Sequence, residues 1–183
     1  MTLSRAWFLF AENRARSEEA RLAAYERGRA AAEQAIAVAP GNAEAHLWYA
    51  IHLGSWANAK GLLRSLLTLR TLRREVDTVL RLDPDNIDGH IVAGSIHRDL
   101  PVLLGGDRAA AEQHFKRVRT LDPHLTGVRV ELAQLYINTG RLAEAREELQ
   151  GVLDEPAPTD RPRWTLKEAP RARAMLEALR DKP

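Results

Sequence analysis

The histidines are the residues whose spacing comes nearest to a metal site or an acid–base pair. His90 and His97 stand seven residues apart in one expected helix, which separates them by about 10 Å along the helix axis, too far for one metal ion. His46 and His52 are six residues apart and point to different sides of their helix. The chain has no cysteine and no HExxH pattern, so the usual zinc ligand sets are missing. The sequence therefore predicts no metal site, and the histidines are interpreted as structural or surface residues.

A second candidate for chemistry is the run Gly105-Gly106-Asp107-Arg108, which has the glycines of a phosphate-binding loop. It is expected to follow a helix rather than a strand, and no Lys-Ser or Lys-Thr comes after it. Asp107 would also place a carboxylate at the start of the next helix, where it repels phosphate. A helix turn is the favoured interpretation. Because no serine has a recognisable histidine and acid partner either, the sequence predicts a non-enzymatic protein without a cofactor.

Arginines form a regular row on the expected helix over residues 62–82. The buried stripe of this helix is predicted to consist of Leu62, Leu66, Leu69, Val76, Val79 and Leu80. A separate row contains Arg70, Arg74 and Arg81, and Leu63 and Leu67 extend it toward the N-terminus. This row is either a solvated charged face or a contact surface for an acidic partner, since arginine binds carboxylates through two parallel hydrogen bonds.

The four tryptophans fall into two groups. Trp7 and Trp48 fit the apolar pattern of helices and are expected in the core. Trp56 is placed in a long turn, and Trp164 in a proline-rich segment. Either of these two could pack a loop against the fold or serve as an exposed anchor for a partner.

The elements that carry these residues follow from an internal repeat. Gly106, Ala111, Phe115 and Val118 are matched, 34 residues later, by Gly140, Ala145, Leu149 and Val152. A 34-residue period built of helix, turn and helix is the signature of the tetratricopeptide repeat, which the last repeat resembles at Leu132, Ala133, Tyr136, Gly140, Ala145 and Leu149.

Prolines mark the ends of the repeated units. Pro40, Pro84 and Pro123 each follow the same apolar helix face, at intervals of 44 and 39 residues. The residues beyond 34 are assigned to long turns around Ser55–Leu62 and Asp99–Gly105. The sequence thus predicts an all-α, tetratricopeptide-like solenoid forming a single domain over 1–183, with helix pairs at about 3–39, 42–83, 86–122 and 125–154 and a capping helix at about 165–181.

Composition narrows the class of partner and the location. The chain is 45% hydrophobic and 28% charged with a net charge of +2, and acidic residues are interspersed among the arginines. No stripe for nucleic acid is therefore expected. The longest apolar run near the N-terminus, Ala6–Ala11, is too short for a membrane span or a signal core. These features predict a cytoplasmic protein, or a periplasmic one if a leader has been removed.

Two family resemblances add to this interpretation. The segment His46-Leu47-Trp48-Tyr49-Ala50, with Gly54 and Leu82-Asp83-Pro84 after it, resembles the regulator of microtubule dynamics family of tetratricopeptide-like proteins. A weaker resemblance, to the T-component proteins of TRAP transporters, rests on Pro101, Leu104-Gly105-Gly106-Asp107, Ala111 and Phe115.

The expected function is that of a non-catalytic scaffold that binds a protein or peptide. The first helix of each pair should line an inner groove, and the shared small position Ala50, Gly94 and Ala133 serves as the ruler for locating the exposed side. The groove-facing candidates are Phe8, Glu12, Leu47, Ile51, Ile91, Ser95, Arg98, Val130, Gln134 and Asn138. An apolar row with few polar groups suits an apolar peptide or small molecule.

Two alternatives remain open at this point. One is a transporter-accessory or small-ligand-binding protein, which would enclose a pocket near the long turns. The other is a self-associating structural module that uses Trp56, Trp164 or the first helix in contacts between its copies.

Overall fold

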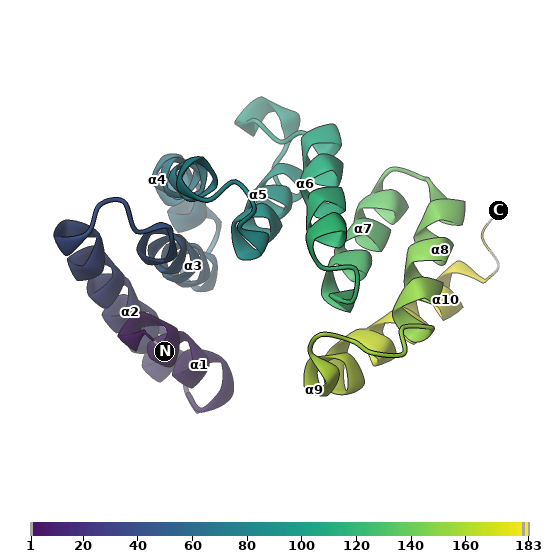
Figure 1. Ribbon diagram of the computed structural model, residues 1–183, viewed down its shortest axis with the longest axis horizontal. Coiled ribbons are helices and arrows are strands. Elements are labelled where there is room, and N and C mark those ends of the chain that lie inside the picture. Colours follow the sequence, from purple (N-terminus) through teal and green to yellow (C-terminus); the bar gives the residue numbers. More distant parts are fainter. Residues whose placement is uncertain (1, 181, 183) are drawn as a thin grey trace. The chain divides into compact units, whose positions relative to one another are not determined.

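Helices and their connecting turns make up the whole of the described chain. The computed structural model describes residues 2–180 and 182, and within them it contains no strand (Figure 1). The predicted all-α class of helix pairs followed by a C-terminal helix is confirmed. The chain divides into two compact units, unit 1 ending at Gly89 and unit 2 starting at His90. The single domain over 1–183 stays a prediction.

Unit 1 is built from two helix pairs in the described residues, with short polar caps at their starts. Thr2, Ser17 and Asn42 each accept a backbone N–H of the following first turn through the side chain, which satisfies a donor that the helix leaves free. The helices are α1 (Leu3–Asn13), α2 (Glu18–Val38), α3 (Ala43–Ala59) and α4 (Leu62–Leu82).

The turn between α3 and α4 is shorter than the sequence predicts. The expected long turn around Ser55–Leu62 is wrong, because α3 continues to Ala59 and α4 begins at Leu62. Gly61 makes this tight connection with a φ of 94°, a conformation that glycine adopts without a steric penalty. Trp56 therefore lies on a helix. Its indole Nε1 donates to Glu26 Oε1 of α2 at 2.9 Å, so it packs within unit 1 rather than on a loop.

Unit 2 holds most of α5 and all later elements. These are α5 (Ile87–Asp99), the 3₁₀ turn η1 (Val102–Leu104), α6 (Arg108–Leu121), α7 (Thr126–Asn138), α8 (Leu142–Leu153), α9 (Arg161–Arg163), the π-helical turn η2 (Trp164–Glu168) and α10 (Ala169–Leu179). The predicted long connection around Asp99–Gly105 is present, and η1 lies within it. Asp107 caps α6 by accepting from the backbone N–H groups of Ala109 and Ala110.

The C-terminal helical segment begins earlier than the predicted start near residue 165. Asp160 accepts the backbone N–H of Arg163 at 2.9 Å, and this cap starts the segment at Arg161. Trp164 lies just inside it, and its Nε1 donates to the Val152 carbonyl oxygen at 2.7 Å. Trp164 thus holds the segment against the end of α8, and it is half-buried rather than an exposed anchor.

The apolar residues that the 34-residue repeat picks out lie in the core of unit 2. The buried faces of α6 and α8 are fully enclosed. The small residues Ala111, Ala133 and Ala145 lie where neighbouring helices contact each other, and larger side chains would not fit there. The fully buried members are Ala111, Phe115, Val118, Ala133, Ala145, Leu149 and Val152. Gly94 on α5 is small for the same reason, since a Cβ there would lie 2.5 Å from the Phe115 ring.

The packing at these alanines gives a first prediction. Ala111→Leu and Ala145→Leu should each lower the free energy of unfolding by about 1–3 kcal/mol, because extra methylenes in a filled core force neighbouring side chains apart. Ala109 on α6 is exposed, so Ala109→Leu is the matched control and should leave stability nearly unchanged. Chemical denaturation of the three variants measures the difference. Equal midpoints would place the buried face of these helices elsewhere.

Candidate functional site

The candidate residues of unit 1 lie on α1 and α3 beside an aromatic cluster. Phe8 is half-buried, and its ring centroid lies 5.7 Å from that of Trp48 and 6.4 Å from that of Tyr25. The exposed Glu12 accepts a hydrogen bond from the Tyr25 hydroxyl at 2.5 Å. Ile51 is half-buried on α3. Glu12 is therefore the most accessible candidate of unit 1, and Phe8 and Ile51 each keep part of their apolar surface exposed.

Leu47 and Val130 do not face outward as predicted. Leu47 retains 4% and Val130 2% of its accessible surface, so neither side chain is available to a partner. Each stands three residues before a buried small residue, Ala50 or Ala133, and side chains three apart share a helix face. Both therefore belong to the core. Ile91, at the equivalent position before Gly94, is half-buried.

Arg98 of α5 is engaged within unit 2. Its guanidinium pairs with Glu131 of α7 and, through Nε, with Asp99 Oδ1 at 2.7 Å. Burial disfavours its charge, but these two carboxylates outweigh that effect and raise the pKa of Arg98 above its ordinary value. The guanidinium also lies over the Phe115 ring, 5.7 Å from its centroid. Arg98 thus joins α5 to α7.

The other candidates of unit 2 are more accessible. Asn138 is exposed, and its Oδ1 accepts from Gln134 Nε2 at 3.1 Å. Gln134 and Ser95 are half-buried. The outer sides of α5 and α7 therefore present a few neutral polar groups beside Ile91.

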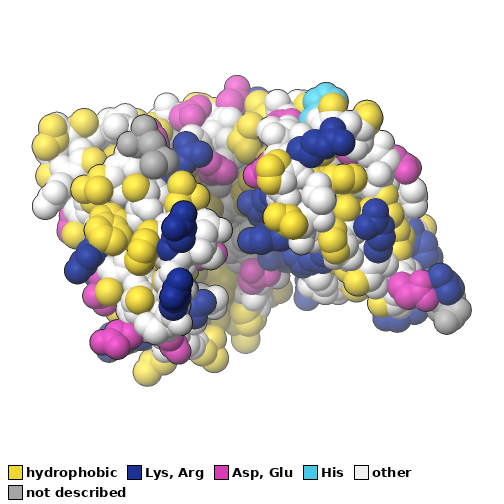
Figure 2. Space-filling model, turned by 90° about the horizontal axis from the view of Figure 1, so that it is seen from below, with side chains coloured by type: hydrophobic (Ala, Val, Ile, Leu, Met, Phe, Trp, Pro, Cys, Tyr) yellow, Lys and Arg dark blue, Asp and Glu magenta, His cyan; other side chains and the backbone are white. Residues whose placement is uncertain are grey.

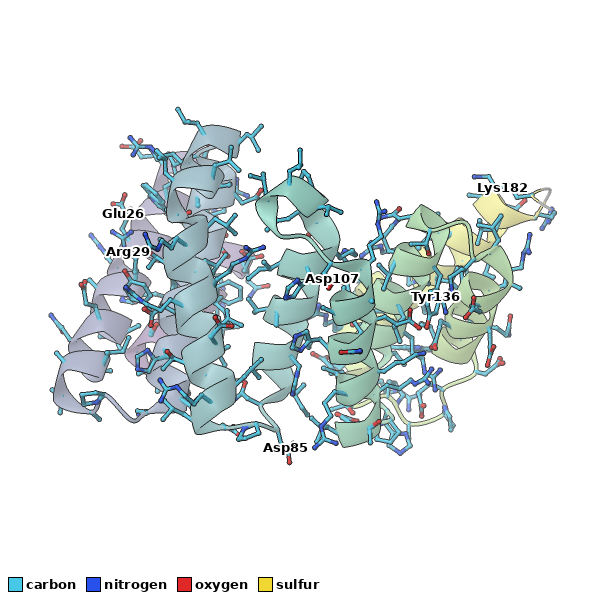
Figure 3. The ribbon with its side chains drawn as sticks, turned by 90° about the horizontal axis from the view of Figure 1, so that it is seen from above. Glu26, Arg29, Asp85, Asp107, Tyr136 and Lys182 are labelled. Carbon is cyan, nitrogen blue, oxygen red and sulfur yellow. The ribbon has the colours of Figure 1, made fainter. Side chains whose placement is uncertain are left out.

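A second charged cluster in unit 2 ties α6 to α7 and α8. Glu112 binds Arg141 and accepts from the Tyr136 hydroxyl at 3.0 Å, and Tyr136 is labelled in Figure 3. The hydrogen bond from Arg141 is the main cause that lowers the pKa of Glu112 to about 2, against the opposing effect of burial. The Arg141 guanidinium lies 4.2 Å from the centroid of the Tyr136 ring. These groups serve the fold, because each is bound by a neighbour within the unit.

Two histidines of unit 1 have structural partners. His46 contacts Glu75 Oε2 through Nδ1 at 2.6 Å and the Pro40 carbonyl oxygen through Nε2 at 2.9 Å. His52 is completely buried, and its Nε2 donates to the Ser4 carbonyl oxygen at 3.0 Å. Burial lowers the pKa of His52, although this hydrogen bond acts in the opposite direction. Both residues connect helices.

The burial of His52 makes the stability of unit 1 sensitive to acid. Because the folded-state pKa of His52 is lowered, the unfolded chain takes up the proton first as the pH falls below about 6.5. The stability from neutral His52 is therefore complete above that pH and is lost as the pH falls toward the lowered pKa. In urea denaturation between neutral and acid pH, His52→Gln should show a smaller loss than the wild type. An identical loss would contradict this assignment.

His114 makes a contact that the sequence analysis missed. It lies on α6, where its Nδ1 is 2.8 Å from Nδ1 of His90 on α5 and its ring stacks on His97 at a centroid distance of 5.9 Å. In this hydrogen bond one of the two Nδ1 atoms must carry the proton and donate, and the other must be unprotonated and accept. Nothing in the spacing of 24 residues between His90 and His114 indicates this pairing. Among the described residues, no group of three or more histidines and carboxylates is arranged to hold a metal ion.

Exposed apolar side chains gather at particular places in unit 1. On α1 they include Leu3, Leu9 and Phe10, and Figure 2 shows hydrophobic surface over the part of the molecule that holds α1 and α2. On α4 they include Leu62, Leu63, Leu66 and Leu67. Figure 3 shows α4 running away from the labelled Asp85, with side chains projecting from its far, N-terminal end. Within the described part of the chain, no helix is both long and apolar enough to cross a membrane.

Two family models match this chain, and the border between their matches lies near the border between unit 1 and unit 2. Residues 1–100 match the family described as regulator of microtubule dynamics protein 1-3, and residues 103–169 match a tetratricopeptide repeat. Regulator of microtubule dynamics protein 3 from Bos taurus is 26% identical over 70% of this chain and 31% of its own length. The protein of the same name from Rattus norvegicus is 25% identical over 66% of this chain and 29% of its own length. The chain thus spans about a third of these relatives.

A solved structure supports the fold independently. A thermophilic tetratricopeptide protein from Thermus thermophilus aligns over 95% of this chain and 99% of its own, with a TM-score of 0.65 and 20% sequence identity. At this identity the likeness concerns the fold, and it agrees with the helix pairs described above.

Proposed function

Since the chain belongs to the regulator of microtubule dynamics protein 1-3 family, we propose that it is a non-catalytic scaffold that binds a protein partner through the faces of its first helices that the sequence predicts to line an inner groove. In unit 1 these faces belong to α1 and α3, and in unit 2 to α5 and α7. The contact residues on them are Phe8, Glu12, Ile51, Ile91, Ser95, Gln134 and Asn138. The proposal places the scaffold in the cytoplasm.

The observation that carries this proposal is the apolar surface left on the first helices. Phe8, Ile51 and Ile91 are each half-buried, whereas the outer face of a helix in a soluble protein is normally polar. Apolar groups beside neutral polar ones, such as Gln134 and Asn138, are what a peptide-binding surface needs. The charged groups Arg98 and Glu112 are already bound within unit 2, which supports a structural rather than a catalytic use of them.

Substitution of the apolar and of the neutral polar residues tests this proposal, once a partner has been isolated with the purified chain as bait. Ile51→Asp and Ile91→Asp should each weaken its binding strongly, because a charge would have to be buried in an apolar contact. Asn138→Arg, at an exposed position, should weaken binding without affecting the fold. Arg173→Glu on α10 is an exposed control and should bind normally.

Melting temperatures separate the outcomes. If all three first-helix variants keep the wild-type melting temperature and still bind the partner, the first-helix faces are not the binding surface. If the Asp variants unfold, the Asn138→Arg result alone decides. Capture of the chain by a second copy of itself, in place of another protein, would favour the self-associating module.

A further inference from the structure

The outer side of α4 carries one continuous stripe that the fold of unit 1 does not use. Residues three, four or seven apart lie on the same helix face, and this spacing runs unbroken from Leu63 to Arg81. We call this surface the α4 stripe. Its members are Leu63, Leu66, Leu67, Arg70, Arg74, Asp77 and Arg81. By helical rise it is about 27 Å long.

The N-terminal half of the α4 stripe is apolar and open to solvent. Leu63 is 71% exposed, Leu67 66% and Leu66 38%. Single exposed leucines are ordinary, but adjacent ones that form a patch mark a place where another surface docks. The sequence predicts Leu66 in the buried stripe, whereas the structure places it at the border between the buried stripe and this patch.

The C-terminal half of the α4 stripe is cationic. No hydrogen bond or ion pair joins Arg70 to any of the residues that the structure describes. Within the described part of the chain, the Arg81 guanidinium approaches only the Thr78 hydroxyl, at 3.5 Å. Arg74 pairs with Glu75 at 2.9 Å, yet 71% of its side chain remains exposed. Asp77 is the one acidic member, so the α4 stripe carries three positive charges and one negative charge.

A groove runs along the cationic half of the α4 stripe and reaches Leu66 of the apolar half. It has a volume of about 540 Å³. Two leucines, four arginines, Asp77 and Thr78 of the same helix line it, and the leucines and arginines are Leu66, Leu69, Arg70, Arg73, Arg74 and Arg81. An elongated ligand could therefore contact leucine and arginine side chains at the same time.

We propose that the α4 stripe binds an acidic amphipathic segment of a partner protein. Apolar side chains of the segment pack on Leu63, Leu66 and Leu67, and its carboxylates pair with Arg70, Arg74 and Arg81 through two parallel hydrogen bonds each. The inference rests on the proposed role as a protein-binding scaffold, but it assigns a second surface, on the second helix of a pair, and a chemical class of partner.

The arrangement of the stripe favours a peptide over a polyanion such as nucleic acid. Nucleic-acid surfaces consist of dense basic patches, whereas this stripe is half apolar and includes Asp77. Exposed ion pairs contribute little by themselves, so the leucines must supply a share of the affinity. Binding should therefore need both acidic and apolar groups in the ligand.

Fluorescence anisotropy with synthetic peptides tests this requirement, at a physiological ionic strength of about 0.15 M. The probe is a labelled helical peptide with leucines along one side and glutamates next to them. Two counterparts carry glutamine in place of glutamate, or serine in place of leucine. We expect the glutamate–leucine peptide to bind about tenfold more tightly than either counterpart, a difference that anisotropy resolves readily. Equal affinity for the glutamine peptide would overturn the proposal, as would full displacement by oligothymidylate.

Variants of the chain locate the binding. Arg70→Glu with Arg81→Glu, and separately Leu63→Ser with Leu67→Ser, should each weaken peptide binding about tenfold. All four positions are exposed, so melting temperatures should be unchanged. Arg173→Glu, which changes the net charge in the same direction, should bind as the wild type does. A similar loss from Arg173→Glu would show that only overall charge matters and would overturn the proposal.

Binding of the peptide to the α4 stripe should not depend on the first-helix surface. Ile51→Asp, Ile91→Asp and Asn138→Arg should leave affinity for the glutamate–leucine peptide unchanged. If these variants lose the natural partner while the α4 variants keep it and also bind the peptide normally, the α4 inference fails and the proposed function stands. If the α4 variants lose both the natural partner and the peptide while the first-helix variants keep both, the first-helix proposal fails and the α4 inference stands.

Discussion

Gly28→Ala should lower the free energy of unfolding by about 3 kcal/mol, although alanine favours a helix more than glycine does. Gly28 lies on α2 where three helices of unit 1 meet. The Ser4 hydroxyl of α1 donates to the Gly28 carbonyl oxygen at 2.8 Å, and the His52 side chain of α3 donates to the Ser4 carbonyl oxygen. A Cβ on Gly28 would lie 2.1 Å from Cε1 and Nε2 of His52. The imidazole would have to move, and its hydrogen bond with Ser4 would break.

The matched control is Gly41→Ala, because a Cβ on Gly41 would meet no atom within 4 Å. Guanidinium denaturation followed by circular dichroism gives both values. We expect Gly41→Ala to be close to neutral or slightly stabilising, since alanine reduces the freedom of the unfolded chain. A Gly28→Ala variant as stable as Gly41→Ala would mean that the contact among α1, α2 and α3 is looser than these distances indicate.

Glu148→Ala should have a comparable effect on unit 2, again about 3 kcal/mol. Glu148 of α8 is buried and pairs with Arg119 of α6 and with Arg129 of α7, the latter at 3.0 Å. Arg129 packs closely against α8, since its Nη1 lies only 2.8 Å from the place that a Cβ on Gly151 would occupy. Removing the carboxylate leaves both guanidinium groups, which are partly shielded from solvent, without their shared ion-pair partner.

Two variants of the same helix isolate the contribution of the charge. Glu148→Gln keeps hydrogen-bonding capacity and should cost less than Glu148→Ala. Glu147→Ala removes an exposed carboxylate one residue away and should change stability by less than about 0.5 kcal/mol. Thermal and urea unfolding of the three proteins give the ranking. An equal loss for Glu147→Ala and Glu148→Ala would show that the buried charge cluster does not hold the three helices together.

Much of the fold could be predicted because it depends on local and periodic signals. The 34-residue repeat locates the buried faces of α6 and α8, since small and large apolar residues at fixed spacing reflect one packing geometry. Capping residues such as Ser17 and Asp107 act within one turn of their own helix, so their effect can be seen in a short window of sequence.

Other features depend on contacts between distant residues and could not be predicted. Leu47 and Val130 are buried because of which helix lies against them, which a pattern within one helix does not report. The pairing of His90 with His114 and the contact of Gly28 with His52 bring together residues 24 apart in both cases. The length of α3 could not be predicted either, since a sequence interval of 44 residues between prolines can be absorbed by longer helices as well as by a longer turn.

The α4 stripe lies between these two cases. Its arginine row and the leucines beside it follow from helical periodicity, and the sequence predicts them. Their exposure does not follow, because the same periodicity is compatible with a buried leucine edge. The structure adds that Leu63 and Leu67 are open and that Arg70 and Arg81 have no carboxylate partner among the described residues.

Hydrogen–deuterium exchange of the chain with and without its isolated partner tests the central claim, that the first helices bind that partner. Binding on their outer faces should slow amide exchange in α1 and α3 or in α5 and α7, with Asn138→Arg reducing the protection in α7. Protection confined to the second helices α2, α4, α6 and α8, with the first helices unchanged, would contradict the account.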